Sequence, residues 1–152
     1  MKKHLKWIMV LAWLIIIFVF SNQPAVISDG NSKFVIKMFE FLGLNLNSIW
    51  GDLANFIIRK LAHFLEYLIL YMLLFNASYN KFNFKKAIII SLLGVVLYAC
   101  SDEIHQLYVP GRASRVRDMI IDTSGGVLGA LIEYVYIKSK QNKFIGGKGE
   151  KS

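Results

Sequence analysis

Ionisable and hydrogen-bonding side chains recur at helical spacing within one apolar segment of the chain. Asn55, Arg59, His63 and Glu66 are separated by four, four and three residues, so on an α-helix they lie on one face, one above another. A histidine beside a carboxylate can act as a general base, and an arginine can bind a phosphate or carboxylate through two parallel hydrogen bonds. This face could therefore support proton transfer or the binding of an anion.

A second polar face ends the next apolar segment. Asp102 and His105 share one side of a helix, and Glu103 and Gln106 lie beside them. The sequence Val109-Pro110-Gly111-Arg112 follows. Because proline restricts φ and glycine frees it, this sequence predicts a tight turn that returns its arginine toward the carboxylates.

The last apolar segment opens with a third polar face. Asp118 and Asp122 are four residues apart and precede Gly125 and Gly129. The two glycines form a GxxxG pair, which typically allows the backbone of another helix to approach closely. Acids and bases on the three faces nearly balance, so we expect the faces to meet and compensate one another.

The polar residues need a physical reason, because a charged side chain at mid-bilayer costs roughly 2.5–3.5 kcal/mol. We expect them to line a polar pocket that opens toward the outer side of a membrane. The candidate catalytic residues are His63, Glu66, Asp102, Glu103 and His105. The candidate ligand-binding residues are Arg59, Gln106, Arg112, Asp118 and Asp122. Histidines and carboxylates can bind Zn²⁺ or Mn²⁺, but no dedicated ligand spacing occurs here, so we assign no metal and no cofactor.

Composition indicates a membrane protein. Of the 152 residues, 55% are hydrophobic before the 11 glycines are added, whereas soluble domains average about 45–50% with glycine included. Segments long enough to cross about 30 Å of hydrocarbon lie at Leu5–Ser21, 54–75, 86–104 and 118–137. We therefore predict an all-α integral membrane protein with four transmembrane helices.

Basic residues predict the orientation of these helices. Eleven lysines lie on the side that holds both termini, and seven lysines and arginines lie on the other side. The positive-inside rule places both termini in the cytoplasm of a multi-pass protein of the cell membrane. Since the basic residues flank apolar segments and form no single patch, nucleic acid is excluded as a partner.

Two segments lie outside the predicted transmembrane helices. The segment Asp29–Asp52 places Lys33, Lys37 and Glu40 at helical spacing among large apolar residues, which predicts an amphipathic helix. This helix could lie on the extracytoplasmic surface or pack on the other helices. We expect residues 1–138 to form one transmembrane domain and residues 139–152 a disordered cytoplasmic tail.

Four ordered motifs resemble the VanZ-like family over roughly residues 5–137. They are the segment 59–67 (RKLAHFLEY), the segment 101–106 (SDEIHQ) with the turn 109–112, Asp118 and Asp122 before Gly125, and the segment 21–24 (SNQP). The family's characteristic polar residues match all ten candidate site residues. The resemblance implies a link to glycopeptide resistance, notably to teicoplanin, in Gram-positive bacteria, and it implies no settled reaction.

Three interpretations of the polar residues remain open. They could bind a membrane lipid, a lipid-linked cell-wall precursor or a lipoglycopeptide, because two arginines can hold a phosphate or carboxylate. They could instead form a membrane-embedded hydrolase or transferase, with His63 paired to Glu66, or His105 paired to Asp102 or Glu103. They could also only hold the helices together. The oligomeric state is not predicted.

Overall fold

The computed structural model describes the backbone of residues 3–149 and the side chains of residues 3–140. Its elements are α1 (Lys3–Ser21), α2 (Ala25–Phe41), α3 (Leu46–Trp50), the short 3₁₀ helix η1 (Gly51–Leu53), α4 (Ala54–Ser78), α5 (Phe84–Gln106) and α6 (Val116–Gly149). Each of these elements in the described residues is helical, which confirms the all-α prediction.

Three helices are long and apolar enough to cross a membrane. They are α1, α5 and the Val116–Lys140 part of α6, and they contain three of the four transmembrane segments predicted from the sequence. The fourth predicted segment, 54–75, lies within the 25-residue helix α4. That helix carries the face with Arg59, His63 and Glu66 and is not among the three.

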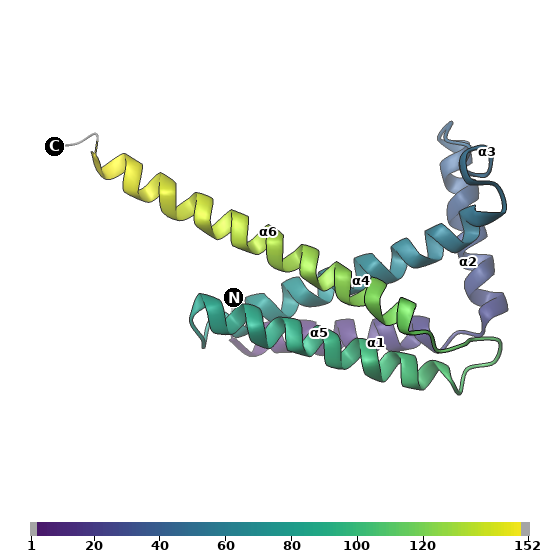
Figure 1. Cartoon of the computed structure of the whole chain (residues 1–152), viewed down its shortest axis with the longest axis horizontal. Coiled ribbons are helices and arrows are strands. Elements are labelled where there is room, and N and C mark those ends of the chain that lie inside the picture. Colours follow the sequence, from purple (N-terminus) through teal and green to yellow (C-terminus); the bar gives the residue numbers. More distant parts are fainter. Residues whose placement is uncertain (1–2, 150–152) are drawn as a thin grey trace.

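Helix α4 lies at the centre of the fold. It packs against α1, α2, α5 and α6, and it crosses α6 near the middle of Figure 1. Tyr67, Leu70 and Tyr71 of α4 are fully buried and join side chains from α1 and α5 in one core cluster. Helix α4 therefore contacts each of the other long helices.

The glycine pair of α6 permits the close crossing with α4. A Cβ atom on Gly125 would collide with the backbone carbonyl oxygen of Phe64, and one on Gly129 would come 2.6 Å from a ring carbon of Tyr71. The close backbone approach predicted from the GxxxG pair is confirmed. This contact brings the start of α6, with its acids, beside the polar face of α4.

Large apolar side chains cover the outer surfaces of the long helices. Leu11 and Ile15 of α1, Leu93 and Leu97 of α5, and Leu131 of α6 are all exposed. Water would penalise so many exposed apolar groups, whereas lipid would not. This surface fits a protein that crosses a membrane several times.

Helix α2 runs across the ends of the long helices (Figure 1). It begins at Ala25, four residues before the predicted Asp29, because Pro24 directs the chain into a new helix. The backbone nitrogen of Ala25 donates to the carbonyl oxygen of Pro110 at 3.3 Å. Gly111 follows with φ +73°, so the tight turn predicted after α5 is present and lies against the start of α2.

Helix α6 extends beyond its predicted end. We expected a disordered tail from residue 139, whereas the helix continues to Gly149. The sequence from 116 to 145 contains neither proline nor a glycine after Gly129, so nothing in it breaks the helix. Residues 150–152 of the expected tail lie outside the described residues, and the division into a domain and a tail stays a prediction.

Candidate functional site

Helices α4 and α6 meet through one ion pair and one histidine–carboxylate contact. Lys60 Nζ lies 2.6 Å from Asp118 Oδ2, and His63 Nδ1 lies 3.8 Å from Asp122 Oδ1. Asp122 is only 1% exposed. The two contacts are three residues apart on α4 and four residues apart on α6, so they are one helical turn apart on both helices.

The C-terminal end of helix α5 contributes three buried polar side chains: Asp102, Glu103 and Gln106. Gln106 Nε2 donates to Asp102 Oδ2 at 3.0 Å and to Ser21 Oγ of α1 at 2.8 Å. Glu103 Oε2 accepts from the backbone nitrogen of Arg115 at 2.7 Å. Glu103 therefore fixes the loop that leads into α6, and Gln106 holds Asp102 in place.

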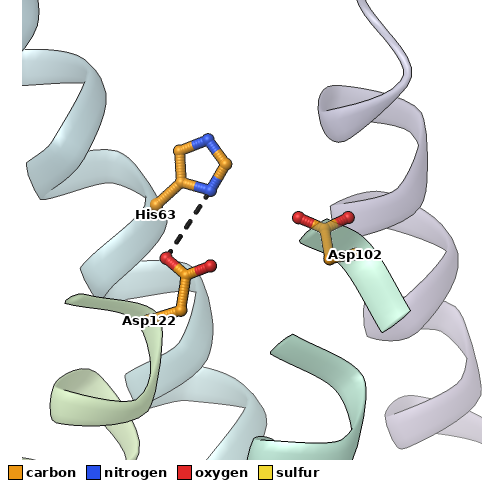
Figure 2. A group of neighbouring side chains, drawn as sticks. All are labelled: His63, Asp102 and Asp122. Carbon is orange, nitrogen blue, oxygen red and sulfur yellow. Dashed lines mark ion pairs between the residues drawn. The ribbon is translucent and has the colours of Figure 1, made fainter. Parts of the chain in front are cut away.

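The three helices bring His63, Asp102 and Asp122 together, a group we call the His63 cluster (Figure 2). One side-chain nitrogen or oxygen from each residue lies within 4.8 Å of those of the other two. Each residue comes from a different long helix. The predicted meeting of the three polar faces is thus present at these residues.

The two predicted arginines contact the chain between α1 and α2. Arg59 Nη1 lies 2.5 Å from Asp29 Oδ1, and Arg112 Nε donates to the carbonyl oxygen of Gln23 at 3.2 Å. Burial lowers the pKa of Arg112, and the nearby guanidinium of Arg59 lowers it further. Two neighbouring guanidinium groups attract an anion more strongly than either does alone.

A first cleft of about 180 Å³ lies between α2 and α4, and we call it the α2–α4 cleft. Arg59, His63, Glu66 and Arg112 line it together with apolar side chains such as Val35. An anion at the arginines would thus have an apolar surface beside it, which suits an amphiphilic molecule.

A second cleft of about 130 Å³, the basic cleft, is lined by five basic residues and one acid. These residues are Arg59, Lys60, Arg112, Arg115, Arg117 and Asp118. Arg59 and Arg112 line both clefts, so the two spaces share one pair of guanidinium groups. The excess of positive charge makes the basic cleft a candidate anion site.

Residues 6–137 match the family model described as VanZ/LLP1. The chain belongs to the VanZ/LLP1 family. All ten candidate site residues lie within the matched region, which agrees with the resemblance carried by their motifs. No curated protein and no solved structure matches the chain. Membership in the VanZ/LLP1 family and three apolar helices together fit a multi-pass membrane protein.

The histidines of this VanZ/LLP1 chain have different partners from those we considered. His63 pairs with Asp122 rather than with Glu66, because α6 packs against the face of α4 that carries the imidazole. His105 Nε2 lies 3.1 Å from Asn22 Oδ1 and its ring lies on that of Phe18. The His105 ring thus contacts the end of α1, and no ion pair with Asp102 or Glu103 occurs among the described side chains.

Several polar residues of the site were missed by the sequence analysis: Ser21, Asp29, Lys60, Arg115 and Arg117. Lys60 lies one residue away from the face defined by Arg59 and His63, so helical spacing did not include it. A lysine inside a predicted membrane segment was nevertheless a signal of a buried partner. Asp29 lies in another helix, and the sequence does not indicate its contact with Arg59.

Proposed function

We propose that this VanZ/LLP1 protein crosses the cell membrane with four helices and binds the anionic headgroup of an amphiphile from the outer side. Both termini are cytoplasmic in this arrangement, as the distribution of lysine predicts. The basic cleft and the α2–α4 cleft then lie near the outer face. The observation that carries the proposal is the pair of guanidinium groups, Arg59 and Arg112, which lines both clefts.

The length and surroundings of α4 support its role as the fourth transmembrane helix. At about 1.5 Å per residue, 25 residues span more than 30 Å. On α4, Lys60 and His63 face the acids of α6, and Arg59 and Glu66 line the α2–α4 cleft. Polar side chains in membrane helices usually face the interior of the bundle and carry function.

Helix α2 is suited to the outer interface of the membrane. It runs across the ends of the long helices (Figure 1), and Val26, Phe34 and Phe41 are strongly exposed. A helix of this kind can bury its apolar side chains among lipid headgroups. In this position α2 forms one wall of the α2–α4 cleft at the level where headgroups lie.

The ligand class follows from the chemistry of the two clefts. Five basic residues around about 130 Å³ favour phosphate or carboxylate over a neutral group. The adjacent apolar lining of the α2–α4 cleft accommodates the start of an acyl or prenyl chain. A membrane lipid, a lipid-linked cell-wall precursor and a lipoglycopeptide share this chemistry, and the last of these connects the site with teicoplanin resistance.

A catalytic role is the second candidate, and the His63–Asp122 pair favours it. A carboxylate beside an imidazole orients it and stabilises its protonated form, so His63 would accept a proton from an attacking hydroxyl or water. Asp102 lies within 4.8 Å of this pair and would add negative charge beside the imidazole. The protein would then be a hydrolase or transferase acting on a lipid-linked envelope substrate held by the arginines.

The test is a comparison of headgroup binding by purified full-length protein in detergent. Fluorescently labelled polyprenyl phosphate, phosphatidylglycerol and teicoplanin are titrated against wild type, Arg112→Ala and Lys37→Ala. Lys37 is a basic residue on α2 outside both clefts and serves as the matched control. A charge-assisted hydrogen bond contributes roughly 1.5–3 kcal/mol, so Arg112→Ala should weaken binding of at least one ligand about tenfold or more. Equal binding by all three proteins would contradict the proposal.

A further inference from the structure

The His63 cluster carries buried acids without matching cations. Asp102 is 4% exposed and Asp122 is 1% exposed, yet among the described side chains no lysine or arginine forms an ion pair with either. Lys60 and Arg59 are paired elsewhere, with Asp118 and Asp29. A buried carboxylate needs a partner of opposite charge or a proton.

One oxygen of the cluster is left without any hydrogen bond. Oδ1 of Asp122 lies near His63, whereas Oδ2 is buried and contacts no donor among the described residues. In Figure 2 this second oxygen lies on the side toward Asp102. It therefore points into the space between the three side chains, where one further positively charged atom would complete its contacts.

The structure assigns a divalent metal site to this space, with His63, Asp102 and Asp122 as its three protein ligands. One imidazole nitrogen and two carboxylate oxygens suit a transition metal such as Mn²⁺ or Zn²⁺. This assignment changes the expectation from the sequence, which gave no metal because no dedicated ligand spacing occurs in it.

The geometry needs only side-chain adjustment to hold an ion. Ligand atoms about 2.1 Å from a tetrahedral metal are ~3.4 Å apart, and the His63 and Asp122 atoms are already at 3.8 Å. All three ligand atoms lie within 4.8 Å of one another. Gln106 donates a hydrogen bond to Asp102 and thereby fixes the orientation of that carboxylate.

Nearby cations are partly offset by nearby carboxylates. Lys60, one helical turn from His63 on α4, and Arg112, which lines the α2–α4 cleft with His63, both disfavour added positive charge. Lys60 is, however, neutralised by Asp118 at 2.6 Å, and Glu66 adds another carboxylate one helical turn from His63 on α4. The site with a metal would leave coordination positions free, since three protein ligands do not fill the shell.

The test uses Mn²⁺ as the probe. Purified full-length protein is stripped with EDTA, and Mn²⁺ binding is followed by the loss of the free-ion signal in electron paramagnetic resonance. We expect one ion per wild-type chain and a higher melting temperature with Mn²⁺ than with EDTA. Substituting a residue that only hydrogen-bonds to a metal ligand weakens metal affinity about 10–100-fold. Asp122→Asn removes a ligand itself, so it should weaken Mn²⁺ affinity at least tenfold. Asp52→Asn, at an exposed acid outside the cluster, should bind as wild type does.

Two further measurements keep the result decisive. If Asp122→Asn does not yield folded protein, His63→Gln replaces it as the ligand variant, with its melting curve as the control for folding. The proposal is overturned if wild type binds no Mn²⁺, or if folded ligand variants bind Mn²⁺ as tightly as Asp52→Asn does. Mn²⁺ binding is measured independently of headgroup binding. Either proposal, the anion site or the metal site, can therefore fail while the other stands.

Discussion

Lys60 of α4 and Asp118 of α6 form an ion pair at the edge of the basic cleft, with 2.6 Å between Nζ and Oδ2. Both side chains are mostly buried, at 15% and 12% exposure. The pair joins the two helices whose crossing positions His63 and Asp122. It therefore links the packing of the fold to the geometry of the candidate site.

Breaking this ion pair should destabilise the protein. Removing one partner of a buried pair leaves an uncompensated charge, so Lys60→Ala and Asp118→Ala should each lower the unfolding free energy by about 3 kcal/mol. The double variant should lose less than the sum of the two, because neither charge is then left alone. Unfolding by denaturant in detergent measures all four proteins. Strictly additive losses would show that the pair is not coupled.

The close crossing of α4 and α6 gives a second prediction. Gly125→Ala should lower stability by about 1–3 kcal/mol, since the added methyl group meets the backbone of Phe64. Gly30→Ala is the matched control on α2, where a Cβ meets no atom within 4 Å. That variant should be neutral or more stable by up to about 1 kcal/mol, since alanine favours a helix. Melting temperatures in one detergent decide the matter, and a Gly125→Ala protein as stable as Gly30→Ala would be incompatible with the crossing.

The proposed topology is tested by labelling single cysteines in intact cells. In a Cys100→Ala background, Lys37→Cys lies on exposed α2 and Lys81→Cys in the turn between α4 and α5. A membrane-impermeant maleimide should label the first from outside and the second only after lysis. That pattern requires α4 to cross the membrane. Labelling of both cysteines from the same side would rule out α4 as a transmembrane helix.

Features that depend on one helix could be predicted from the sequence, whereas contacts between distant segments could not. Four-residue spacing indicated the polar face of α4, and Gly125 with Gly129 indicated a close crossing, because these patterns depend on one helix only. The partner of Arg59 is Asp29, which lies on a helix whose orientation no local pattern specifies. Likewise, His63 could reach Glu66 or Asp122, and only the packing of α6 decides between them.

The contacts of the two arginines predict how substitutions near them change the affinity for an anion. Arg59 is held by Asp29 and Arg112 by the carbonyl oxygen of Gln23. Asp29→Asn should therefore free Arg59 and tighten anion binding, while Arg59→Ala should weaken it about tenfold or more. Isothermal titration with a short-chain lipid phosphate measures both effects. A weaker affinity in Asp29→Asn would mean that this aspartate positions the arginine more than it competes with the ligand.

The most direct test of the central claim is native mass spectrometry of full-length protein with two matched amphiphiles, a polyprenyl phosphate and the polyprenol that lacks the phosphate. Anion binding at Arg59 and Arg112 predicts that wild type retains the phosphate and not the alcohol, and that Arg112→Ala loses this preference. Equal retention of the two amphiphiles by wild type would contradict the account.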